Sequence, residues 1–285
     1  MDNTGPFVLI TGSSRGIGRA IALAFADRGG RVAVHYHTRK DAADQVLAEV
    51  RARGGDGFTV AADVTRDAEI RRLIARVRQE FGALDVLVSN ARPEMAAFYQ
   101  PPLSLTTSAW QTALDSQATA FLVSLQASAS LLRDGGRVVA ITYSPSTRLG
   151  SWQPWVAMGA AKAAMEALVR YFAVALGPRR ITVNAVSPGF VLGQHGTLDA
   201  TVINGLPAEV RDAIREWHEG GWTPLRRLAT PADVAEVVAM LAGRAGDFVT
   251  GQTLHVDGGA SIMDAFCPLQ IQGIEETTSL QARGS

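Results

Sequence analysis

The sequence predicts a single doubly wound α/β domain, in which helices cover both faces of a seven-stranded parallel sheet. Seven short apolar runs alternate with helix-length segments, as they do when each strand returns through a helix to a parallel neighbour. The runs are rich in valine and isoleucine and lack polar alternation, which indicates strands buried on both faces. With 285 residues and 47% apolar residues, the chain can build one large core. The runs span 7–10, 31–36, 57–61, 84–89, 136–142, 180–186 and 252–256.

We expect the domain to span residues 1–260, with a polar tail over 261–285. The segment 193–222 interrupts the strand–helix rhythm and carries a short apolar stripe of Val210, Ile214 and Trp217. It is interpreted as a substrate lid, the alternative being an ordinary surface helix packed on the body. The tail either crosses a subunit interface or frays.

The charge balance favours a small-molecule partner. The chain has 27 acidic and 27 basic residues and no long basic run, so it lacks the electrostatic signature of a nucleic-acid or acidic-membrane binder. Cys267 is the only cysteine, which excludes an internal disulfide, and the five histidines show no metal-ligand spacing, so no metal is expected. Without a signal peptide or a membrane-length apolar segment, a cytoplasmic location is expected.

A glycine-rich turn follows the first strand and opens a helix. Glycines let the backbone approach a pyrophosphate, and the helix N-terminus supplies N–H donors and a favourable dipole. Strand, turn and helix occur in the order that a dinucleotide site requires, which argues against a plain tight turn. The predicted contacts are Gly12, Ser13, Ser14, Arg15, Gly16, Ile17 and Gly18.

The end of the second strand favours NADP(H) over NAD(H). It carries His37, Arg39 and Lys40 and lacks the acid that would hold a ribose 2′-hydroxyl. Together with Arg15, these cations can bind a 2′-phosphate through charge-assisted hydrogen bonds. The alternative is that they are solvated charges that open the next helix.

Lys162 is one of only two lysines among the 27 basic residues, and it lies in a long, largely apolar helical pattern. Met158 and Trp155, four and seven residues earlier, share its side of the helix. Neither side chain is an acid near neutral pH. A compact ammonium therefore lies where neither helical neighbour can donate a proton, which favours a functional role for Lys162. The alternative is that the Lys162 side chain only extends from a buried helix to place its ammonium in water.

These motifs together resemble the short-chain dehydrogenase/reductase family, over the chain to about Gly259. The resemblance implies a Rossmann-type sheet of order 3-2-1-4-5-6-7 and a homotetramer. The matching motifs, in family order, are TGSSRGIG, Asp63-Val64, Ser89-Asn90-Ala91, Lys162, Pro188-Gly189 and Val256-Asp257-Gly258-Gly259. The resemblance further implies cofactor contacts from Asp63 and Val64 at the adenine, Asn90 at the ribose, Lys162 at the nicotinamide ribose and Val191 near the nicotinamide, together with Ala91, Pro188 and Gly189.

The chain departs from the family where the chemistry occurs. The usual catalytic tyrosine falls at Met158, the serine at Tyr143 and the helix asparagine at Gln117. The glycine that usually follows Asn-Ala is Arg92. The ordinary mechanism, in which a tyrosine protonates an alkoxide, is therefore in doubt.

The altered pattern is similar to that of the enoyl-thioester reductase branch. There a tyrosine precedes the lysine by seven residues, a methionine-glycine lies between them, and a tyrosine often ends the fifth strand. Met158-Gly159 and Tyr143 match this pattern, whereas Trp155 replaces the branch tyrosine. Within the branch, the chain resembles reductases of cyclic enoyl-CoA substrates such as cyclohexenylcarbonyl-CoA reductase.

The chemistry agrees with this branch. Hydride delivery to a ketone leaves a localised alkoxide that needs an acid, whereas delivery to an enoyl thioester leaves a much less basic enolate. We expect Tyr143 and Lys162 to be the catalytic residues, with Tyr143 donating a hydrogen bond to the enolate. The predicted function is NADPH-dependent reduction of the C=C bond of an acyl thioester. One alternative is an atypical ketoreductase, and another is an inactive dinucleotide-binding protein.

A mainly aromatic set is predicted to line the substrate pocket. Each member has a simpler interpretation, such as plain core packing for a tryptophan or Tyr143, or a surface position for a histidine. The arginine in the set meets either the phosphate-bearing arm of a thioester or only solvent. The set is Arg92, Tyr99, Trp152, Trp155, Met158, Trp217 and His218.

Overall fold

The computed structural model describes residues 5–143, 152–193, 198 and 201–264. Its strands form one parallel sheet in the order β3-β2-β1-β4-β5-β6-β7, which confirms the predicted fold class and strand order. The strands are β1 (Phe7–Ile10), β2 (Arg31–Tyr36), β3 (Asp56–Ala61), β4 (Leu84–Ser89), β5 (Leu132–Ile141), β6 (Thr182–Pro188) and β7 (Thr253–Val256).

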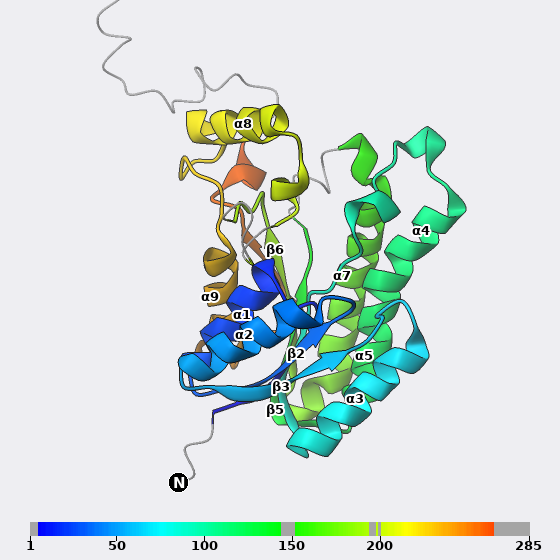
Figure 1. Ribbon diagram of the computed structural model, residues 1–285, viewed down its shortest axis with the longest axis vertical. Coiled ribbons are helices and arrows are strands. Elements are labelled where there is room, and N and C mark those ends of the chain that lie inside the picture. The colour runs from blue at the N-terminus through cyan, green and yellow to red at the C-terminus, as the bar shows by residue number, and fades with distance from the viewer. Residues whose placement is uncertain (1–4, 144–151, 194–197, 199–200, 265–285) are drawn as a thin grey trace, which may run out of the picture.

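Helices cover both faces of the sheet (Figure 1). Helices α1, α2 and α9 pack on one face, and α3, α5 and α7 pack on the other. Helices α4 and α8 lie beyond these two layers. Their bounds are α1 (Gly16–Ala26), α2 (Lys40–Ala52), α3 (Asp67–Phe81), α4 (Thr107–Leu114), α5 (Ala120–Ser128), α7 (Val156–Leu176), α8 (Ala208–Trp217) and α9 (Pro231–Ala242).

The strands β1, β2, β4, β5 and β6 contribute side chains to two cores, because successive side chains point to opposite faces of the sheet. In β1, Val8 and Ile10 pack with the α1, α2 and α9 layer, whereas Leu9 packs with the opposite layer. All three residues are fully buried. This explains why the strands lack polar alternation in the sequence.

The starts of two strands differ from those predicted by more than one residue. The sixth strand begins at Thr182 rather than at residue 180, because Arg180 adopts a left-handed conformation with φ of 57° that ends the preceding turn. The fifth strand begins earlier than predicted, at Leu132, and its pairing with β4 shifts register between Leu84 and Val86. Neither shift changes the positions of the carboxyl ends of the strands, where ligands bind in such sheets.

The segment predicted as a lid contains α8, which lies at the end of the molecule opposite the N-terminus (Figure 1). None of the residues of α8 is buried, and Val210 and Trp217 are about half exposed. The tail predicted over 261–285 falls outside the described residues beyond Asp264. Across the part of the chain that the structure covers, no helix combines the length and the apolar character needed to cross a membrane.

Candidate active site

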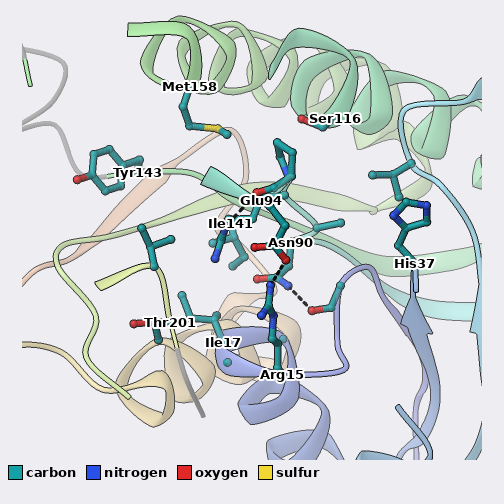
Figure 2. A pocket seen from close by; sticks show the side chains of 18 of the residues that line it. Arg15, Ile17, His37, Asn90, Glu94, Ser116, Ile141, Tyr143, Met158 and Thr201 are labelled. Carbon is teal, nitrogen blue, oxygen red and sulfur yellow. Dashed lines mark hydrogen bonds and ion pairs between the residues drawn. The ribbon is translucent and has the colours of Figure 1, made fainter. Parts of the chain in front are cut away.

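A cavity of about 510 Å³ lies along the carboxyl ends of the central strands. In Figure 2, His37 and Tyr143 mark its two ends, Arg15 lies on one side and Met158 on the other. Every predicted cofactor contact except Ser13 lines this cavity. The predicted substrate residues Arg92, Trp152, Trp155 and Met158 line it as well, together with both predicted catalytic residues.

The glycine turn is held in place from two sides. Asn90, just after β4, donates from Nδ2 to the carbonyl oxygens of Thr11 and Gly12 at 2.9 and 3.0 Å. The buried His35 accepts a hydrogen bond from the Gly12 N–H at 2.8 Å through Nδ1, and its Nε2 lies 3.1 Å from the Ala62 carbonyl oxygen. Burial lowers the pKa of His35 to about 4, so this histidine is neutral and orders the turn.

The turn has no room for larger residues. A Cβ added to Gly18 would lie 2.3 Å from the Gly12 carbonyl oxygen, and one added to Gly12 would lie 2.8 Å from the Ala91 Cα atom. Gly12 also has φ of 66°, a conformation that glycine adopts at little cost. The backbone can therefore approach a phosphate group closely, as a dinucleotide requires.

The cations near β2 divide into two groups. Arg39 and His37 line the cavity, but Lys40 does not, because its ammonium pairs with Asp44 at 2.6 Å on the surface of α2. On the opposite wall, the guanidinium of Arg15 is hydrogen-bonded and ion-paired to Glu94 from the loop after β4 (Figure 2). This pair joins the glycine turn to that loop across the cavity.

Lys162 projects from α7 toward the end of β5. Its Nζ donates to the Ile141 carbonyl oxygen at 2.5 Å, and its side chain is only 8% exposed. Burial lowers the pKa of Lys162 to about 7, with Arg92 lowering it further and the buried Glu166 opposing the change. The ammonium therefore lies within the cavity wall and is sensitive to the charges around it.

An aromatic wall surrounds this lysine. Trp152 and Trp155 stack with ring centroids 5.0 Å apart and planes within 6°, and Tyr143 lies 5.3 Å from Trp155. The Nε1 of Trp155 is buried and has no hydrogen-bond partner. Burial, followed by the neighbouring Tyr99, raises the pKa of Tyr143. This phenol therefore keeps its proton and can act as a hydrogen-bond donor.

The positions of the family's catalytic tyrosine and helix asparagine hold no phenol. Met158 is 1% exposed and lines the cavity. Gln117 lies in a π-helical turn, Asp115–Thr119, where its Nε2 donates to the Ala91 carbonyl oxygen at 3.1 Å. It is buried outside the cavity, and its neighbour Ser116 lines the cavity instead.

Four predicted site residues lie off the cavity wall. Ser13 is fully buried, and its hydroxyl donates to the Ile10 carbonyl oxygen at 2.8 Å. Tyr99 packs behind the two tryptophans of the wall, 5.6 Å from Trp152. Trp217 stacks on Trp222 at 4.5 Å, so it turns toward its own chain segment.

His218, the fourth, is buried with its Nδ1 2.5 Å from the Thr223 hydroxyl oxygen, and burial lowers its pKa. Its ring lies 5.2 Å from that of Phe190, which does line the cavity. His218 thus supports the wall from behind.

The part of 193–222 that reaches the cavity lies before α8. The Gly16 N–H, at the start of α1, donates to the Leu198 carbonyl oxygen at 2.5 Å. Thr201, Val202 and Ile203 line the cavity, and the Thr201 hydroxyl donates to the Val191 carbonyl oxygen. The sequence did not identify these residues or Glu94 as part of the site. They belong to loops that approach the cavity only in the folded chain, and no periodic pattern or motif marks such loops. In the described portions of the chain, no cluster of three His, Cys, Asp or Glu side chains could hold a metal ion.

Comparisons with known proteins agree with this geometry. A family model described as enoyl-(acyl carrier protein) reductase matches residues 12–261. The chain is 37% identical over 258 residues to 1-cyclohexenylcarbonyl-CoA reductase of Streptomyces collinus, covering 90% of this chain and 86% of that protein. It is 33% identical to the hydroxynaphthalene reductase-like protein Arp2 of Metarhizium brunneum, covering 90% and 95% of the two chains.

Among solved structures, the angucycline C-6 ketoreductase LanV with bound NADP matches with a TM-score of 0.80 and 32% sequence identity. The match covers 92% of this chain and 98% of that one. Sequence, topology and site geometry thus agree with the predicted resemblance. The chain belongs to the short-chain dehydrogenase/reductase family.

Proposed function

We propose that this protein is an NADPH-dependent reductase of the C=C bond of an α,β-unsaturated acyl thioester. The observation that carries the proposal is the composition of the wall beside Lys162. A methionine occupies the position of the family's proton-donating tyrosine, and the phenol that remains, Tyr143, has a raised pKa. Such a wall can donate hydrogen bonds, but it is poorly suited to protonating an alkoxide.

The residues of the cavity fit NADP(H). The glycine turn offers a surface that a Cβ would fill, and α1 directs its N-terminus toward it. His37 and Arg39 line the end of the cavity next to β2, where a 2′-phosphate would find cations. Bound NADPH supplies a hydride. The NADP named with LanV supports the same choice by similarity.

The chain's own residues then have separate tasks. Lys162 holds a ribose hydroxyl and adds positive potential, and its hydrogen bond to the Ile141 carbonyl oxygen fixes its position. Tyr143 makes no hydrogen bond to the other described residues, and its hydroxyl would donate to the thioester oxygen. The stacked Trp152 and Trp155 present a flat apolar wall to the acyl group and limit the access of water. The similarity to 1-cyclohexenylcarbonyl-CoA reductase supports a cyclic acyl group.

A second candidate is reduction of a ketone, which the similarity to LanV and to the hydroxynaphthalene reductase-like protein favours. In that case the substrate's own hydroxyl or Tyr143 would replace the missing acid. A third candidate, an inactive dinucleotide-binding protein, predicts cofactor binding without turnover. Retention of Lys162 in a chain with 27 basic residues and only two lysines argues against it.

The test is NADPH consumption with three thioesters in parallel: crotonyl-CoA, cyclohexenylcarbonyl-CoA and acetoacetyl-CoA. Cofactor oxidation is followed by absorbance, and each product is identified by mass. We expect oxidation with an enoyl substrate and none with the ketoester. Turnover of acetoacetyl-CoA alone would refute the proposal and assign the protein to the ketoreductases.

A further inference from the structure

We propose that Arg92 is a catalytic residue of this reductase, whose guanidinium donates hydrogen bonds to the substrate carbonyl oxygen on which negative charge accumulates. The inference rests on the proposed function and adds a charged donor to Tyr143 and Lys162. Arg92 comes directly after Asn90-Ala91 at the end of β4 and lines the same cavity as Lys162. The family resemblance implies a glycine at this position, so the arginine side chain is a departure from the usual family pattern.

The guanidinium of Arg92 has no ionic partner among the residues that the structure describes. It makes one hydrogen bond, from Nη1 to the neighbouring Pro93 carbonyl oxygen at 2.9 Å. No carboxylate of the described residues lies within ion-pair distance of it. Glu94, the acid near enough to influence Arg92, binds Arg15 instead. Four of the five donor hydrogens of Arg92 therefore remain available to a ligand.

Two other partly buried arginines have carboxylate partners. The side chain of Arg137 is 13% exposed and pairs with Asp247, and that of Arg19 is 18% exposed and pairs with Glu49. A shielded guanidinium is normally compensated in this way, because an unpaired charge away from water is costly. The missing partner at Arg92 points to an anionic group on the ligand.

The location of Arg92 favours the substrate over the cofactor phosphates. Arg15 and the start of α1 line the side of the cavity where we expect the cofactor phosphates. Arg92 lies close enough to Lys162 for its charge to lower the pKa of that lysine. Burial, and then Arg15, lowers the pKa of Arg92 itself only to about 10, so it stays charged at neutral pH. The two cations and Tyr143 line the same cavity.

The proposed step balances without another co-reactant. The cofactor's hydride forms the new C–H bond at the β-carbon, and the π-electron pair of the C=C bond moves through the α-carbon onto the carbonyl oxygen. Arg92 and Tyr143 donate hydrogen bonds to that oxygen while it is negative. The electrons then return to the α-carbon, which takes a proton from water. The substrate is reduced by one hydride and one proton, and NADPH is oxidised to NADP⁺.

The test compares Arg92→Met and Arg92→Lys with the wild type on the enoyl thioester that the wild type reduces. We expect Arg92→Met to lower kcat/KM by about 10²–10³-fold, as loss of one oxyanion donor does. Arg92→Lys should recover part of this loss, and added guanidinium ion should partly rescue Arg92→Met. The dissociation constant of NADPH, measured by fluorescence, should stay within about 3-fold. Equal losses in NADPH affinity and kcat/KM would overturn the proposal and make Arg92 a cofactor anchor.

A binding measurement tests whether Arg92 binds the charged substrate oxygen, and it does not require turnover. The probe is cyclohexene-1-carboxylate, whose carboxylate mimics the charged oxygen, titrated into the enzyme–NADP⁺ complex with tryptophan fluorescence as the signal. Trp152 and Trp155 on the cavity wall provide that signal. We expect at least 10-fold weaker binding to Arg92→Met. The matched control Arg39→Met, at the other end of the cavity, should weaken NADPH binding but keep the carboxylate affinity.

Unchanged carboxylate affinity in a folded Arg92→Met or Arg92→Lys protein would refute the role of Arg92. If the wild type reduces only ketones, the proposed function fails. The carboxylate titration still decides whether Arg92 binds a substrate anion, so the two failures are distinguishable.

Discussion

Lys162 should release its proton near pH 7, and this chain allows a direct measurement. The protein has only two lysines, Lys40 and Lys162, so labelling with ¹³C- or ¹⁵N-lysine yields two side-chain signals. Lys40 is exposed, and its hydrogen bond to Asp44 raises its pKa above the ordinary value. It is therefore an internal control that should stay protonated while Lys162 titrates.

The magnitude follows from the environment of Lys162. Burial, reinforced by Arg92, lowers its pKa from 10.5 to about 7. At about 1.4 kcal/mol for each pH unit, the charged form is disfavoured by about 5 kcal/mol relative to water. Between these two values the unfolded chain carries one more proton than the folded protein. The contribution of Lys162 to stability is therefore least favourable below pH 7 and improves as pH rises toward 10.5.

Two perturbations sharpen the test. Arg92→Met removes a neighbouring positive charge and should raise the titration midpoint of Lys162, whereas Arg39→Met should leave it unchanged. In the wild type, kcat/KM should fall as pH rises through the Lys162 midpoint, because the positive potential is lost. A midpoint above pH 10 for both lysines, or no response to Arg92→Met, would show that the electrostatic description of this site is wrong.

Three further substitutions test other parts of the structure. Gly18→Ala places a Cβ 2.3 Å from a backbone carbonyl oxygen. It should destabilise the protein by about 1–3 kcal/mol, measured by thermal unfolding, and weaken NADPH binding, measured by fluorescence titration. Its matched control, Gly159→Ala, meets no atom within 4 Å in α7 and should be neutral or stabilise by up to about 1 kcal/mol. Glu94→Gln frees Arg15 for the cofactor phosphates and should tighten NADPH binding several-fold at low salt, so weaker binding would contradict a competing role for Glu94. Thr230→Ala removes the capping box of α9 and should cost about 1 kcal/mol in denaturant unfolding, with little change in activity.

The sequence by itself determined the layer architecture, and it predicted where the cofactor site lies. Both depend on local patterns, namely apolar runs of strand length and a glycine turn between a strand and a helix. A strand such as β1 must bury both faces whatever surrounds it, so its class could be predicted without knowing its neighbours. Lys162 also stood out in the sequence, because a lone ammonium in an apolar helix needs a chemical reason.

The tertiary structure decided which of the candidate charges and rings reach the cavity. Lys40 and Arg39 are adjacent in sequence, yet Lys40 pairs with Asp44 while Arg39 lines the cavity. Glu94 finds Arg15 across 79 residues of sequence, which leaves Arg92 without a carboxylate. A charged side chain selects its partner by distance in space, and residue spacing along one helix or strand carries no information about a contact between distant segments.

The same reason applies to the segment 193–222, whose role as a substrate lid remains a prediction. The apolar stripe of α8 indicated that one face is covered, but the stripe does not specify what covers it. Trp217 stacks on Trp222 and His218 turns to Thr223, while the loop residue Thr201 lines the cavity without any periodic signal. The apolar stripe of α8 stays about half exposed, so periodicity indicates only which side chains share a face, and the fold determines which surface, if any, that face contacts.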